Sequence, residues 1–138
     1  MSPPGFEPAL DATIEFTSRA PAEARRMVEE LAPEVEPGVL RDAQLLVSEV
    51  VTNSIRHSAS DDPIGLRAWL RQNRLKVEIA DGGYGFDAGE IGVRDDAEGG
   101  RGLMIVEALA DRWGVSCDAR ARVWFELSPR PVSRAQAG

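Results

Sequence analysis

Two glycine-rich turns, separated by a short acidic loop, are the part of this sequence best suited to chemistry. The first turn, Gly82–Gly85, directly follows an apolar run that ends in Asp81. The second, Gly99–Gly102, directly precedes a helical pattern that begins at Leu103. Glycine lets the backbone approach a ligand closely, and the free N–H groups at a helix N-terminus bind phosphate. The first turn suits a flat polar ring held by Asp81 and the second suits phosphates, so together they predict one nucleotide site.

A second set of polar residues recurs every four positions in a helix predicted over residues 39–58. Glu49, Asn53 and His57 form this stripe, and on a helical wheel it lies at the margin of the apolar side. Polar groups at such a margin are half-buried and need partners. Taken alone, the same stripe is also typical of a solvated helix face. For His57 a structural or capping role is favoured over a catalytic one.

The elements that must hold these residues follow from the hydrophobic pattern. Further helices are predicted from Pro21 to Leu31 and from Leu103 to Ala110. Alternating residues predict strands at 13–16, 64–70, 75–79, 113–117 and 123–127, with Gln72 and Asn73 turning the second strand into the third. The long helix packs through Ala43, Val47, Val50, Val51 and Ser54. Helices and hairpin strands in this order predict an α+β two-layer sandwich, with a mixed, mostly antiparallel sheet and helices on one face.

Composition limits the classes of function. The 138 residues are 43% hydrophobic and 28% charged, which fits one domain with its own core. We place that domain at 11–128, between a flexible N-terminus (1–10) and a flexible C-terminal tail (129–138). The formal net charge of -7 argues against a nucleic-acid partner. No apolar run approaches the ~20 residues that span a membrane, no signal peptide is visible, and the single cysteine indicates a cytoplasmic protein.

Three segments, taken in order, carry a resemblance to a known family: Glu49–Asn53, Asp81–Gly85 and Gly100–Leu103. They resemble the motif boxes of the GHKL ATPases, which include gyrase-type topoisomerases, heat-shock chaperones, sensor histidine kinases and anti-sigma-factor serine kinases. The first segment with its neighbours, and the ending Leu109–Gly114, look most like the small stand-alone anti-sigma-factor serine/threonine kinases. The resemblance covers residues 13–127 and implies the histidine-kinase/gyrase-like (Bergerat) ATPase fold.

The resemblance also implies a role for each matching residue. Asp81 would accept a hydrogen bond from the adenine amino group, while Gly83 and Gly85 leave room for the ring and sugar. Asn53 would hold Mg²⁺ through its side-chain oxygen, and Glu49 would be the general base. The phosphates of ATP would lie against Gly100, Arg101, Gly102 and Leu103. The acidic loop at 87–98 would form a lid.

One segment departs from the family pattern. Members often carry a threonine just before the last strand, where it helps the aspartate hold adenine. Here the segment is Arg120–Arg122, with Ala121 at its centre. One lost hydrogen bond is worth about 1 kcal/mol, so both ATP affinity and phosphoryl transfer stay open.

Two classes of function fit these observations. The first is a serine/threonine protein kinase that uses ATP and Mg²⁺, phosphorylates an anti-sigma-factor antagonist and binds a sigma factor; Glu49 favours it. The second is a non-catalytic or weakly ATP-binding partner-switching module of the same fold, which Arg120–Arg122 favours. A sensor histidine kinase ranks third, because nothing before Thr13 could serve as its phospho-accepting hairpin. The expected partners are proteins, and a homodimer is possible.

Overall fold

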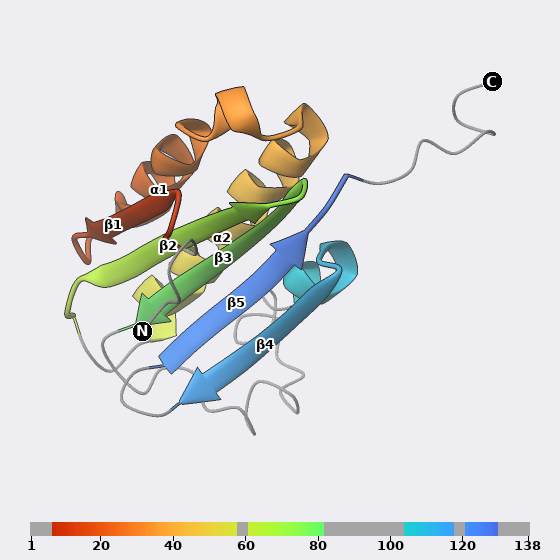
Figure 1. Cartoon of the computed structure of the whole chain (residues 1–138). Coiled ribbons are helices and arrows are strands. Elements are labelled where there is room, and N and C mark those ends of the chain that lie inside the picture. Colours follow the sequence, from red (N-terminus) through yellow and green to blue (C-terminus); the bar gives the residue numbers. More distant parts are fainter. Residues whose placement is uncertain (1–6, 58–60, 82–103, 118–120, 130–138) are drawn as a thin grey trace.

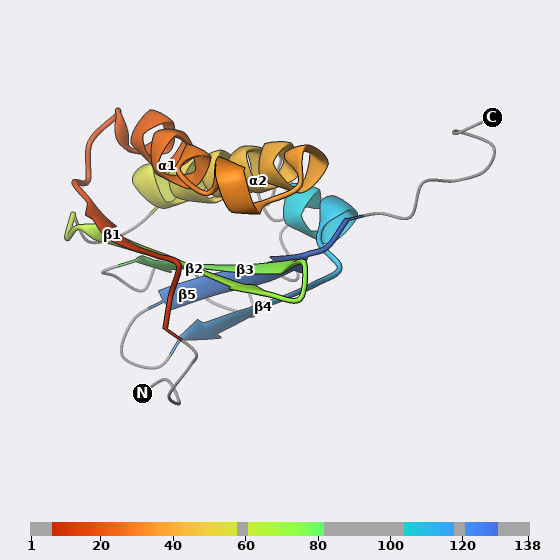
Figure 2. The ribbon, with the colours of Figure 1, turned by 45° about the horizontal axis from the view of Figure 1, so that its top comes forward.

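The chain folds as a five-stranded sheet with all described helices on one of its faces (Figure 1, Figure 2). The computed structural model describes residues 7–57, 61–81, 104–117 and 121–129. In chain order the elements are β1 (Leu10–Ile14), α1 (Ala20–Glu29), the 3-10 helix η1 (Ala32–Glu34), α2 (Pro37–His57), β2 (Ile64–Arg71), β3 (Arg74–Asp81), β4 (Arg112–Cys117) and β5 (Ala121–Leu127). Residues 104–109 are also helical.

The strand order in the sheet is β1-β2-β3-β5-β4. All the strand pairings within the described residues are antiparallel. β3 lies at the centre, between β2 and β5. This arrangement confirms the predicted two-layer α+β fold, and it puts the end of β3 between neighbouring strands instead of at an edge.

A tight turn joins β2 to β3 and sets their register. Gln72 and Asn73 have φ values of 54° and 66°, as the two central residues of a type I′ hairpin turn require. Asparagine tolerates this left-handed conformation better than most residues. The turn pairs Arg71 with Arg74 and continues to the pair Gly65 and Ala80, so the predicted hairpin is confirmed.

The core lies between the sheet and the helices. On β3, Leu75, Val77 and Ile79 are fully buried and face the helical layer, and Val123 and Phe125 do the same on β5. α2 packs against them through residues predicted for its apolar side, Ala43, Val47, Val50 and Val51, and through Leu46. Leu45, on the outer side of α2, is 42% exposed.

The other face of the sheet has no described helix over it (Figure 2). Its side chains alternate with the core row along β3 and are half-buried, among them Lys76 and Glu78. The Lys76 ammonium lies 5.9 Å from the ring of Trp69 and 5.1 Å from that of Trp124, within the range of a cation–π interaction. Polar side chains on this face are therefore separated from the helical layer by the sheet.

Several element boundaries differ from the prediction by one to three residues, and β1 and α1 show why. The first strand runs from Leu10 to Ile14, not over 13–16, because its partner β2 begins at Ile64, which pairs with Ile14. Beyond that pair the chain has no strand to bond to, so Phe16 lies outside the sheet and packs half-buried against the core. The first helix ends at Glu29, and the buried Leu31 precedes η1 instead of belonging to α1.

Candidate nucleotide site

Asp81 is the last residue of β3 and is completely buried, with 0% of its surface exposed. Because side chains alternate along a strand, it continues the row of Leu75, Val77 and Ile79 that faces the helices. It is thus a carboxylate at the end of an apolar row, on the inner face of the sheet. The predicted position of Asp81 at a strand end is confirmed.

Two more buried polar residues come from the last turns of α2. Asn53 is 7% exposed and Ser54 is 1% exposed. Both figures of the whole fold show the C-terminal end of α2 over the C-terminal end of β3 (Figure 1, Figure 2). Residues 53 and 54 on α2 and residue 81 on β3 therefore belong to the same end of the sandwich.

The polar stripe on α2 divides into a buried and an exposed part. Asn53 is buried, Glu49 is half-buried and His57 is exposed. Asn53 therefore does not lie on a solvated helix face. Glu49 is half-buried, as predicted for a residue at the margin of the apolar side. His57 lies on the last turn of α2.

Hydrogen bonds at the other end of α2 fix how this helix lies. The Val39 N–H donates to the Glu36 carboxylate over 2.9 Å, which satisfies one of the free donors of the first turn. The Gln44 amide donates to the Arg25 carbonyl (3.0 Å) and to the Glu29 carboxylate (2.9 Å). The two bonds of Gln44 tie α2 to α1, so α2 is held both by the sheet beneath it and by the helix beside it.

Most of the predicted nucleotide-binding residues lie outside the described residues. They are Gly83 and Gly85, predicted at the ring and sugar, and Gly100, Arg101, Gly102 and Leu103, predicted at the phosphates. The predicted lid at 87–98 and Arg120 also lie outside them. The chain is described again from residue 104, and Val106 in the helical segment 104–109 is fully buried against the core. Of the predicted site, the structure therefore places Glu49, Asn53 and Asp81.

Ser54 is a buried polar residue that the sequence pattern did not single out. The helical wheel puts it on the apolar side of α2, and there a small serine is indistinguishable from a small core residue. Its hydroxyl is buried, and within the described part of the chain it makes no hydrogen bond. A hydroxyl in a row of valines is the signal that could have identified it.

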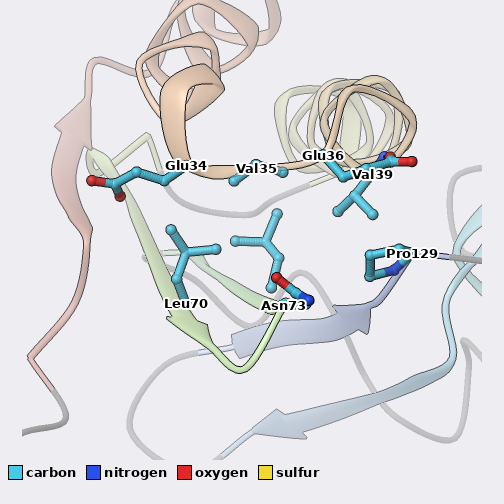
Figure 3. Close-up of a pocket in the computed structure, with 8 residues that line it drawn as sticks. Glu34, Val35, Glu36, Val39, Leu70, Asn73 and Pro129 are labelled. Carbon is cyan, nitrogen blue, oxygen red and sulfur yellow. The ribbon is translucent and has the colours of Figure 1, made fainter.

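A small cavity lies at the opposite end of the sandwich, near the turn between β2 and β3 (Figure 3). Its lining includes Glu34, Glu36, Val39, Leu70 and Asn73. Its volume of about 20 Å³ has room for a single water molecule. It is far too small for a nucleotide and lies at the start of β3, away from Asp81.

The residues at the Asp81 end of the sandwich fit an adenine nucleotide with Mg²⁺. A buried carboxylate and a buried hydroxyl can bind the polar edge of a base, and an amide oxygen such as that of Asn53 is a hard ligand suited to Mg²⁺.

Among the described residues no three histidine, cysteine, aspartate or glutamate side chains gather to hold a metal. The same part of the chain contains no helix long and apolar enough to cross a membrane.

Comparison with known proteins agrees with this geometry. Residues 14–125 match the model of the histidine kinase-like ATPase domain. Serine-protein kinase RsbW of Listeria monocytogenes serovar 1/2a is 33% identical over 86 residues, which cover 52% of this chain and 55% of the relative. RsbW of Bacillus licheniformis is 31% identical over 98 residues, 61% of each chain.

A solved structure gives the same fold at much lower identity. The Acinetobacter baumannii histidine kinase AdeS superposes with a TM-score of 0.52 at 13% identity, over 86% of this chain and 66% of that one. Two layers, a buried aspartate at the end of β3 and the family match together define the class, an ATPase domain of the GHKL type. The chain belongs to the histidine kinase-like ATPase domain family. It spans between about half and three-fifths of the length of the curated serine-protein kinases that it matches.

Proposed function

We propose that this chain is a serine/threonine protein kinase of the anti-sigma-factor type, which binds ATP with Mg²⁺. The observation that carries the proposal is the position of Glu49 and Asn53 on α2, the helix whose C-terminal end lies over the end of β3. The buried Asp81 is the last residue of that strand. The likeness to serine-protein kinases supports the choice of phosphate acceptor. Its protein partners would be a sigma factor and an antagonist of the anti-sigma factor, and the proposal places it in the cytoplasm.

Adenine would be bound at the end of β3. The Asp81 carboxylate would accept a hydrogen bond from the amino group of the base, and the surrounding apolar row would exclude water from that bond. A hydrogen bond to an ionised acceptor in such surroundings is stronger than one in water. Gly83 and Gly85, next along the chain, would let the ring and sugar approach the backbone.

The phosphates would be held from two sides. Asn53 would hold Mg²⁺ through its amide oxygen, and the metal would neutralise charge on the phosphates. Gly100, Arg101, Gly102 and Leu103 would contribute backbone N–H groups and one guanidinium at the start of the helical segment. Phosphoryl transfer depends mostly on such positioning and charge stabilisation.

Glu49 would activate the acceptor. It precedes Asn53 by four residues, which is about one turn or ~6 Å along a helix, so a proton acceptor and a metal ligand share one face of α2. The Glu49 carboxylate would take the proton of a serine or threonine hydroxyl of the antagonist as that oxygen attacks the γ-phosphorus of ATP. The bond from this phosphorus to the β–γ bridging oxygen would break, and ADP would leave. A well-placed base contributes about 10²–10⁴-fold to the rate.

A non-catalytic binding module is the second candidate, and one observation favours it. Ala121 lies directly opposite Asp81 in the sheet, within the segment where members of the family often carry a threonine. The experiment that separates the candidates is a transfer assay with radiolabelled ATP, using antagonist proteins that co-purify with the chain. Phosphoserine or phosphothreonine on the antagonist supports the kinase, whereas ATP binding without any transfer supports the binding module.

A further inference from the structure

The Ser54 hydroxyl is a buried polar group without a hydrogen bond among the described residues. The residue is 1% exposed, so bulk water does not reach it. Leaving a buried hydroxyl unsatisfied costs free energy, and nearly all buried polar groups in native proteins have partners. Such a group therefore indicates that its hydrogen-bond partner comes from outside the described residues.

Ser48 shows that α2 can satisfy a buried serine when nothing else is needed. Ser48 is also buried, and its hydroxyl donates to the Leu45 carbonyl over 2.9 Å. Ser48 and Ser54 stand on one helix, have the same side chain and are both removed from solvent. They differ in that one hydroxyl is satisfied by its own helix and the other is not.

The position of Ser54 on α2 indicates where a partner of its hydroxyl would lie. Ser54 follows Val47 by seven residues and Val50 by four, so it ends the row of α2 that packs on the sheet. Asp81 ends the facing row of β3. The two apolar rows thus run to the same end of the sandwich and each finishes in a buried polar residue (Figure 1, Figure 2).

The strand beside Asp81 supplies no hydroxyl of its own. Ala121 is the Cα partner of Asp81 across β3 and β5, and it is 1% exposed. A second side-chain hydroxyl for a ligand held by Asp81 would therefore come from outside β5. Ser54, on the helix above, is a buried residue at that end with an available donor.

We propose that the Ser54 hydroxyl is a base-recognition group that donates, directly or through one bridging water, to ring nitrogen N1 of adenine. This inference rests on the proposed binding of ATP. The polar edge of adenine carries a donor, the amino group, next to an acceptor, N1. An anionic acceptor such as Asp81 beside a hydroxyl donor complements that edge. Guanine presents a carbonyl oxygen and an N1–H at the same places, so its oxygen would face the Asp81 carboxylate.

Dissociation constants for ADP test the proposal with wild type, Ser54→Ala and the matched control Ser48→Ala. One hydrogen bond corresponds to roughly a three- to tenfold change in affinity. Ser54→Ala should weaken ADP binding by that factor, whereas Ser48→Ala should leave it within twofold. In thermal unfolding without ligand, Ser48→Ala should lower the melting temperature more than Ser54→Ala does. The reason is that Ser48→Ala removes a satisfied hydroxyl, whereas Ser54→Ala removes an unsatisfied one.

The analogue 1-deaza-ADP, in which N1 is replaced by a C–H group, gives a thermodynamic cycle of two proteins (wild type and Ser54→Ala) and two nucleotides. Wild type should bind it roughly three- to tenfold more weakly than ADP, and Ser54→Ala should bind both nucleotides equally. Equal ADP affinity of wild type and Ser54→Ala would overturn the inference, as would an equal loss for both nucleotides in the variant, which would make Ser54 structural. Both results leave ATP binding itself intact. A wild-type chain that binds neither nucleotide refutes the proposed function as well, so the two failures are distinguishable.

Discussion

Asp81 and Ala121 face each other across the central strands β3 and β5, and both side chains are buried. The Asp81 carboxylate is therefore flanked by a methyl group on the neighbouring strand and by apolar side chains along its own. A carboxylate in such surroundings forms strong hydrogen bonds with a donor, but it receives no help from a hydroxyl on β5. In the proposed site, adenine recognition would therefore rest on Asp81 and on groups from elements other than β5.

The first prediction concerns Asp81 itself. Asp81→Asn should weaken ATP binding roughly ten- to hundredfold, because a hydrogen bond to a charged group is worth about 1.5–3 kcal/mol. Isothermal titration calorimetry measures the change. Glu78→Gln is the matched control, since Glu78 is on the same strand but on the opposite face of the sheet and should bind ATP as wild type does. If Asp81→Asn binds equally well, Asp81 is not part of the adenine site.

The second prediction concerns the phosphate-binding turn. ADP and ATP should bind more tightly than adenosine, and added salt should reduce this advantage because it screens charge. Arg101→Ala should cost about tenfold or more in ADP affinity and leave adenosine binding unchanged. Fluorescence titration at two salt concentrations provides the measurement. Adenosine and ADP binding with the same affinity would show that the second glycine turn is structural only.

The third prediction separates binding from catalysis on α2. Glu49→Ala should keep most ATP binding but lose about 10²–10⁴-fold in phosphoryl transfer. Asn53→Ala should lose both, because Mg²⁺ connects nucleotide binding with transfer. Single-turnover assays with labelled ATP and an antagonist protein give both quantities. His57→Ala, at an exposed position of the same stripe, should behave as wild type, and a transfer defect there would instead assign His57 to the site.

The fourth prediction compares two neighbouring leucines on α2. Leu46 is fully buried, whereas Leu45 is 42% exposed. Leu46→Ala should lower the free energy of unfolding by about 2–5 kcal/mol, since it leaves a cavity in the core. Leu45→Ala should change it by less than about 0.5 kcal/mol. Urea denaturation measures both values, and equal effects would contradict the packing of α2 against the sheet.

Much of the fold could be predicted because its signals are local. Alternating apolar residues identified β2, β3 and β5, and Gln72 with Asn73 identified the turn between the first two. The length of β1 could not be predicted in this way, because it depends on where its partner β2 begins at Ile64. Strand ends are set by pairing with distant residues, which a local pattern does not contain.

By itself the sequence determined the motif residues and the family, since glycine turns, a strand ending in Asp81 and a helix carrying Glu49 and Asn53 can be read from residue types and spacing. Only the tertiary structure decided which polar residues are buried together. A helical wheel treats Asn53 and His57 alike, yet the sheet lies beneath one and leaves the other exposed. It also treats Ser54 as one more small residue on an apolar side. Whether such a hydroxyl lacks a partner depends on the atoms that surround it in the folded chain, which a local pattern does not contain.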